Sequence, residues 1–206
     1  MQRLARTDTY RRIPAQSVNF RSALQILAVL IFASLHPRYC AAQQERPTES
    51  QVKAAYVYNF GKFVRWQPSA PRFNSFDICV LGKNPFGSVL QTTVSGETID
   101  GKSILVKNIA NTGEAVHCSI LFISSSEESG LKPILSAARP LNVLTVSDIP
   151  AFAQRGGMIE LVSQAGRIRF AVNLDAASDA GLNVSSELLK VAVRVIQTKK
   201  IREIDK

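Results

Sequence analysis

Apolar positions first form one continuous block and later recur with the periods of helices and strands. The block runs from Ala23 to Leu35, behind a head rich in arginine. From Thr48 onward, apolar residues recur every three or four positions, or in short runs closed by glycine or serine. The first pattern is typical of a targeting segment, and the second is typical of a folded domain with helices and strands.

Residues 48–66 predict the first helix. Thr48 and Gln51 have the spacing of a capping box, with Thr48 as the N-cap. The apolar residues of its expected buried face follow at spacings of four, four and three: Val52, Tyr56, Phe60 and Phe63. Lys53 falls on the opposite side, where we expect solvent. The helix should reach about Trp66, because a proline two residues later ends it.

Later apolar runs predict a sheet. Four runs read as strands: residues 76–81, 103–108, 119–123 and 143–146. Helical segments are expected between them, at about 85–94 and 127–135. Two further runs, residues 158–162 and 168–174, predict an antiparallel hairpin around Ala165 and Gly166.

The C-terminal region predicts one more helix, from Ser185 to about Thr198. Ser185 has the character of an N-cap. The apolar stripe that suggests the helix comprises Leu188, Leu189, Ala192, Val195 and Ile196.

This order of elements predicts an α/β fold in a single domain. Strands that alternate with helices, followed by a hairpin and a helix, favour a three-layer sandwich with a mixed β-sheet flanked by helices. The hairpin is expected toward one edge of the sheet. The expected division of the chain is a signal peptide at 1–42, a disordered lead at 43–49, the α/β domain at 50–198 and a basic C-terminal tail at 199–206.

The N-terminal block has the parts of a secretory signal peptide: a basic head, a short apolar core and small residues near a cut site. The core of about 13 residues is short for roughly 30 Å of hydrocarbon. Cleavage after Ala42 would place Cys40 and Ala42 at the two positions that must be small. We therefore predict a cleaved signal and an exported protein. An uncleaved N-terminal anchor is the alternative.

Removal of this segment changes the charge of the chain. The whole chain has a net charge of +9, from 25 basic and 16 acidic residues. Residues 1–42 hold six of the basic residues and one acid, so the remainder has a net charge of +4. Most of the basic excess therefore belongs to the targeting segment. This argues against nucleic-acid binding, which needs a clustered basic face.

Motifs of enzymes and metal sites are missing from the sequence after residue 42. It holds one histidine, His117, and lacks Cys-x-x-Cys, His-x-x-x-His, a phosphate-binding glycine loop and Gly-x-Ser-x-Gly. His117 and Cys118 would point to opposite faces of a strand and pair poorly. Asp148 and Asp175, at apparent strand ends, read as helix caps. We expect no catalytic residue, no metal site and no cofactor.

Two regions are candidates for binding. Trp66 reads as an anchor at the edge of the core or as an exposed aromatic that contacts a partner protein, since tryptophan is enriched in interface hot spots. Gly82, Phe86 and Ser124 follow predicted strands. Open α/β sheets often bind ligands at such strand ends, so these three residues are a candidate ligand site.

Cys79 and Cys118 remain if the signal is removed. Two cysteines in an exported chain suggest a disulfide. Two buried free thiols that pack as small apolar residues are the alternative.

Seven blocks of sequence, taken in order, resemble the YfiR-like family of small periplasmic proteins. The first block is VKAAYVYNFGKFVRW, at residues 52–66. The others are residues 78–82, 117–124, 143–148, 156–159, 169–174 and 181–190. Together they span nearly all of residues 50–196.

The resemblance implies a function as well as a fold. The family's characterised member is a periplasmic repressor that binds the periplasmic sensor region of an inner-membrane diguanylate cyclase. Its hold on the cyclase lowers cyclic-di-GMP and limits biofilm. The resemblance also implies a disulfide between Cys79 and Cys118. The characterised member has a second, later disulfide, which is missing here because no cysteine follows Cys118.

We therefore expect a non-enzymatic regulator that represses an inner-membrane signalling protein, most simply a diguanylate cyclase. A homodimer is kept as a possible assembly. The alternative is a periplasmic small-ligand sensor without a cyclase partner.

Overall fold

The computed structural model describes residues 46–67 and 73–198. The predicted signal peptide, residues 43–45 of the predicted lead, and the predicted tail lie outside the described residues. None of the helices in the described part of the chain is long and apolar enough to cross a membrane.

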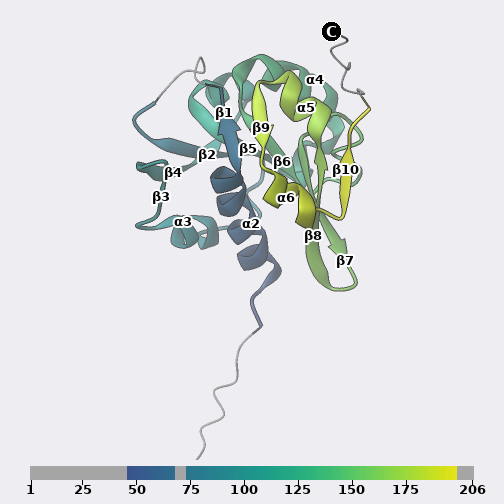
Figure 1. Cartoon of the computed structure of the whole chain (residues 1–206). Helices are drawn as coiled ribbons and strands as arrows, with labels where there is room; N and C mark the ends of the chain where they lie inside the picture. Colours follow the sequence, from purple (N-terminus) through teal and green to yellow (C-terminus); the bar gives the residue numbers. More distant parts are fainter. Residues whose placement is uncertain (1–45, 68–72, 199–206) are drawn as a thin grey trace, which may run out of the picture. The chain divides into compact units, whose positions relative to one another are not determined.

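An eight-stranded mixed sheet forms the centre of the domain (Figure 1). Its strands, in spatial order, are β10 (Arg194–Ile196), β8 (Arg167–Asn173), β7 (Ile159–Gln164), β6 (Leu144–Ser147), β5 (Cys118–Ile123), β2 (Phe76–Leu81), β4 (Lys102–Ile109) and β3 (Thr98–Ile99). Strands β4, β2, β5, β6 and β7 run parallel to one another, whereas β7 with β8 and β3 with β4 are antiparallel hairpins. The mixed sheet and single α/β domain predicted from the sequence are confirmed.

Helices cover both faces of this sheet. One face carries α2 (Glu49–Phe63), α3 (Val89–Val94), α5 (Leu174–Asp179) and α6 (Ser186–Val191). The other carries α4 (Leu131–Ala138) and short 3-10 helices: η1 (Thr112–His117), η2 (Ser125–Gly130) and η3 (Arg139–Leu141). A separate two-stranded antiparallel sheet joins β1 (Val64–Trp66) to β9 (Leu182–Val184).

Each face has its own core. On the first face, the ring of Phe60 from α2 meets Phe170 of β8 edge-to-face at 5.2 Å between centroids. On the second face, Leu131 of α4 and Phe152 pack against the buried side of β5. The all-buried pattern of β2 reflects its place between two layers, as expected for a central parallel strand.

The first helix is shorter than the sequence predicts. Thr48 caps it through the predicted capping box with Gln51, but it ends at Phe63. Residues 64–66 form β1 because the backbone there pairs with β9, more than 100 residues away. Trp66 therefore lies on a strand and not at a helix end.

The predicted C-terminal helix is wrong beyond Val191. Ser185 caps α6 as expected, but residues 194–196 form β10, which runs parallel to β8. The segment has a second pattern, with Val193 and Val195 in strand alternation, and the pairing with β8 favours that pattern over the helical stripe.

Other elements differ mainly at their boundaries. The predicted helix at 85–94 begins only at Val89, and the one at 127–135 is η2 followed by α4. Strand β3, helix α5 and strand β9 were not predicted. The four predicted strands and the hairpin around residues 165–166 are present.

Candidate functional site

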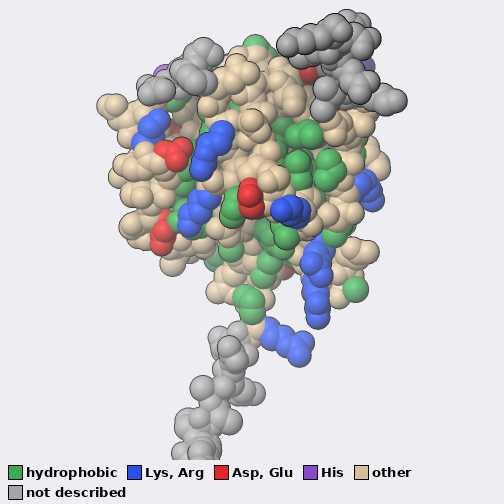
Figure 2. Space-filling view, in the orientation of Figure 1, with side chains coloured by type: hydrophobic (Ala, Val, Ile, Leu, Met, Phe, Trp, Pro, Cys, Tyr) green, Lys and Arg blue, Asp and Glu red, His purple; other side chains and the backbone are tan. Residues whose placement is uncertain are grey.

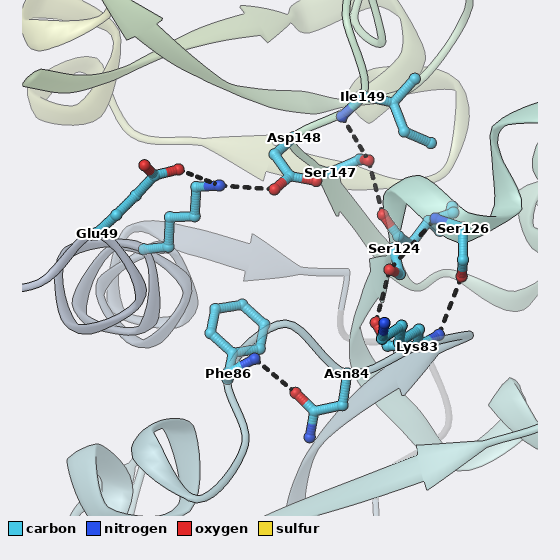
Figure 3. Close-up of polar contacts among 11 residues, drawn as sticks. Glu49, Lys83, Asn84, Phe86, Ser124, Ser126, Ser147, Asp148 and Ile149 are labelled. Atoms are coloured by element: carbon cyan, nitrogen blue, oxygen red, sulfur yellow. Dashed lines mark hydrogen bonds and ion pairs between the residues drawn. The ribbon is translucent and has the colours of Figure 1, made fainter. Parts of the chain in front are cut away.

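The parallel strands bring two groups of polar residues to opposite ends of the sheet. We call the residues that follow β2, β5 and β6 the carboxyl edge: 82–86, 124–126 and 148–149. We call the opposite end, where these strands begin, the amino edge. Figure 3 shows the carboxyl edge.

The carboxyl edge contains the predicted ligand residues Gly82, Phe86 and Ser124, and the structure places all three there. The hydroxyl of Ser124 is buried and donates to the Lys83 carbonyl at 2.7 Å (Figure 3). The hydroxyl of Ser126 accepts from the Lys83 amide at 2.9 Å. These bonds tie the loop after β2 to the loop after β5.

Gly82 and Phe86 are also occupied by contacts within the fold. Gly82 has a φ of +84°, and a Cβ there would collide with the side chains of Ser126 and Glu127. Phe86 is buried, and its ring meets Phe122 edge-to-face at 4.7 Å. All three residues are therefore engaged in contacts within the fold. Their role in ligand binding stays a prediction.

A charged group occupies the neighbouring part of the carboxyl edge. The Lys53 ammonium donates to the Asp148 carboxylate and to the Glu49 carboxylate, both at 2.6 Å (Figure 3). The Lys53 side chain is only 14% exposed, so its predicted place on the solvent side of the helix is wrong. Asp148 does not cap a helix. It holds α2 against the end of β6.

Burial acts to lower the pKa of Lys53, but the hydrogen bonds and charges of Asp148 and Glu49 outweigh it. The pKa is therefore raised above its ordinary value of 10.5. The second oxygen of Asp148 is buried and has no hydrogen-bond partner among the described residues. Lys53 is thus the group that neutralises Asp148.

Buried polar side chains fix the loop that follows Asp148. The Ser147 hydroxyl donates to the Ile123 carbonyl at 2.7 Å and accepts from the Ile149 amide at 3.0 Å. Glu160 accepts from the amides of Ala151 and Ala153 at 3.0 and 3.2 Å. The side chains of Ser147 and Glu160 therefore fix the conformation of this loop.

The amino edge holds a cavity of about 370 Å³, at the opposite end of the strands from the predicted ligand site. Aromatic side chains, two cations and the Asp100 carboxylate share its wall. Its lining includes Arg65, Trp66, Phe73, Phe76, Lys102, Cys118, Ser119 and Asn142. An apolar wall with convergent polar groups is the usual composition of a small-molecule site.

Trp66 lines this cavity and is half-buried. Its indole Nε1 donates to the Asn142 carbonyl at 2.9 Å, and its ring meets Phe76 edge-to-face at 5.4 Å. Both contacts anchor it in the fold. A contact between Trp66 and a partner protein remains a prediction.

The structure joins Cys79 and Cys118 in a disulfide, the pairing that the resemblance implies. The bridge links β2 to β5, with 5.9 Å between the Cα atoms, and both residues are buried. His117 lies at the end of η1 and not on a strand, and its ring contacts Phe73. With Cys118 in the bridge, these neighbours form no nucleophile and base.

Metal ligands do not gather in the part of the chain that the structure describes, where no group of three or more histidine, cysteine, aspartate or glutamate side chains could hold an ion. Lys107 pairs with the buried Asp77, and Arg155 pairs with Glu128 at 2.9 Å. These ionic contacts join neighbouring elements of the fold.

Three solved structures are similar to this chain at low sequence identity, and the first of them, with a TM-score above 0.5, shares its fold. A conserved domain protein from Vibrio cholerae O1 biovar El Tor is 12% identical, with a TM-score of 0.51, and the match covers 69% of this chain and 59% of that one. An ABC domain in complex with L-Trp from Streptococcus pneumoniae is 14% identical, with a TM-score of 0.48 and coverage of 69% and 60%. A ligand-free substrate-binding protein with adhesive properties from Clostridium difficile is 12% identical, with a TM-score of 0.44 and coverage of 70% and 58%.

The chain thus spans about three fifths of the length of the solved structures that it matches. No curated protein matches it. A protein-family model described as YfiR/HmsC-like matches residues 50–193, which include most of the described domain. The chain belongs to the YfiR/HmsC-like family.

Proposed function

We propose that this chain is a periplasmic, non-enzymatic regulator. It binds the periplasmic sensor region of an inner-membrane diguanylate cyclase and holds the cyclase inactive, which lowers cyclic-di-GMP. The observation that carries the proposal is membership of the YfiR/HmsC-like family over residues 50–193.

Two features of the domain support this proposal. The buried Cys79–Cys118 disulfide suits an oxidising compartment, where such bonds persist. The hydroxyls of Ser124, at the carboxyl edge, and of Ser147, at the end of β6, donate to backbone carbonyls, and this leaves them little capacity for chemistry on a substrate. The first feature favours a periplasmic location, and the second favours a protein that acts through contact.

Cross-linking in living cells tests the proposal. The full chain, carrying a C-terminal affinity tag, is cross-linked in its native host, and captured proteins are identified by mass spectrometry. We expect a membrane protein that carries a diguanylate cyclase domain. A matched chain that lacks residues 2–42 should capture none, because it stays in the cytoplasm. Absence of any membrane signalling protein from the full-chain sample would contradict the proposal.

A small-ligand sensor is the second candidate function, and the cavity at the amino edge favours it. Arg65 and Lys102 suit an anionic group, whereas Trp66 and Phe76 suit an apolar body. A thermal-shift screen of anionic aromatic metabolites tests this role. A ligand of this site should raise the melting temperature of the native chain but not that of Lys102→Met. Lack of any stabilising compound would count against a sensor.

A further inference from the structure

Strand β10 is held to the sheet with little burial. Of the eight strands that the described residues contribute to this sheet, β10 alone has no buried residue. Val193 and Val195 are 46% and 41% exposed, and Figure 2 shows hydrophobic side chains at the surface in the region of α6 and β10. Because apolar burial is the main favourable term in folding, release of this strand would cost the domain little.

Main-chain hydrogen bonds dock the segment. The Val193 amide donates to the Phe170 carbonyl at 2.9 Å, and the register of β10 with β8 continues to Ile196. The Thr198 amide donates to the Asp175 carboxylate at 2.6 Å. A helix would satisfy these amides within the segment itself, because each residue added to a helix gains one main-chain bond. The two arrangements therefore differ little in main-chain bonding.

The sequence of the segment also fits a helix. Helix α6 ends at Val191 after only six residues, although Leu188, Ala192 and Val195 continue the helical spacing of four and three. Ala192 ends the helix with an extended backbone, at φ −69° and ψ 137°. No glycine or proline stands between Ala192 and Thr198 to forbid a longer helix.

Branched side chains decide between the two arrangements. Val193, Val195 and Ile196 are β-branched, which favours an extended backbone and lowers helix propensity. The strand is therefore the dominant state, and the helix is disfavoured by a small margin. A conflict of this kind between a local preference and the global fold is expected at functional sites.

We propose that residues 192–198 are a two-state segment. In the dominant state they dock as β10, and in a minor state they continue α6 as a helix. The minor state uncovers the outer edge of β8, where the Phe170 carbonyl loses its bond from Val193. An uncovered strand edge is a template for another strand, so a partner strand that pairs with β8 would draw the segment into the released state. The inference does not rest on the proposed function.

Chemical-exchange saturation transfer NMR on the full chain tests for the minor state. Two conformations that lie close in free energy leave the minor one at about 0.1–10% of molecules. We expect a minor state in that range, with helical Cα chemical shifts at residues 192–198. Replacement of both Val193 and Val195 by alanine favours the helix and disfavours the strand, so the minor population should rise about tenfold.

A proline variant and a surface control complete the test. Val195→Pro should abolish the minor state, because the Val195 amide faces away from β8 and proline is tolerated in the strand but breaks a helix. Val116→Ala is the matched control, since Val116 is 48% exposed on η1. It should leave the minor population unchanged. A melting curve of each variant verifies that the domain folds.

Three results would overturn the inference. One is the absence of a minor state from both the native chain and the double alanine variant. Another is a minor state with random-coil Cα shifts, since the strand would then merely fray. The third is a minor state that persists in Val195→Pro. All three are separate from the cross-linking experiment, because capture of a cyclase does not depend on the populations of this segment.

Discussion

At the scale of single residues, the disulfide between Cys79 and Cys118 is the only covalent cross-link between side chains in the described part of the chain. They are 39 positions apart, and closing such a loop contributes about 4 kcal/mol on the chain-entropy model. Replacement of both by alanine should lower the free energy of unfolding by up to about that amount. Urea denaturation measures it.

A thiol reductant gives the control for this prediction. It should destabilise the native chain and leave the double alanine variant unaffected. Equal stability of the two chains under oxidising conditions would contradict the assigned role of the bridge.

A second prediction at the scale of single residues concerns Lys53. Its replacement by methionine leaves Asp148 partly buried without its cation, and we expect a loss of about 1–3 kcal/mol in the free energy of unfolding. Lys132→Met is the matched control, since Lys132 is exposed on α4 and makes no ion pair with a described residue. That control should lie within about 0.5 kcal/mol of the native chain.

The contribution of Lys53 should depend on pH in a defined direction. Its pKa is raised in the folded state, so its stabilising effect is fully present below about pH 10.5 and is lost as the pH rises through the folded-state pKa. The stability difference between the native chain and Lys53→Met should therefore shrink in alkaline solution. A difference that grows with pH would show that the ammonium does not stabilise the fold.

At the scale of elements, the C-terminal strand can be distinguished from the helix that the sequence predicts. Ile196→Pro removes an amide that faces β8 and should cost about 1–3 kcal/mol, whereas Val195→Pro removes an outward amide and should cost less. In a helix, both prolines would be equally harmful, at about 3 kcal/mol each. Urea denaturation of the two variants decides between these outcomes.

Local sequence patterns predict those helices, strands and turns that are determined by residues close together in the chain. The strand at 118–123 and the hairpin around residues 165–166 need only a short apolar run and a turn, and both are present. Thr48 and Gln51 likewise form their capping box within one turn of helix. Sequence alone is enough for such elements because neighbours in the chain decide them.

Features that depend on distant residues were missed. β1 forms because residues 64–66 meet β9, and Lys53 is partly buried where it pairs with Asp148, 95 positions later. No local pattern reports either contact. The alternation of Val193 and Val195 was the one signal for β10, and the helical stripe in the same segment obscured it.

For the whole molecule, family membership and the fold support a protein that works through contact. The sheet is covered on both faces, and the hydroxyls of Ser124 and Ser147 near its carboxyl edge donate to backbone carbonyls. The cavity at the amino edge has the composition of a small-molecule site.

We propose that this chain restrains a membrane diguanylate cyclase from the periplasmic side. Intracellular cyclic-di-GMP, measured in the native host with and without the gene, tests it most directly. We predict that deletion raises cyclic-di-GMP, and that the full chain restores the lower level while a chain lacking residues 2–42 does not. An unchanged level of cyclic-di-GMP after deletion would contradict this role.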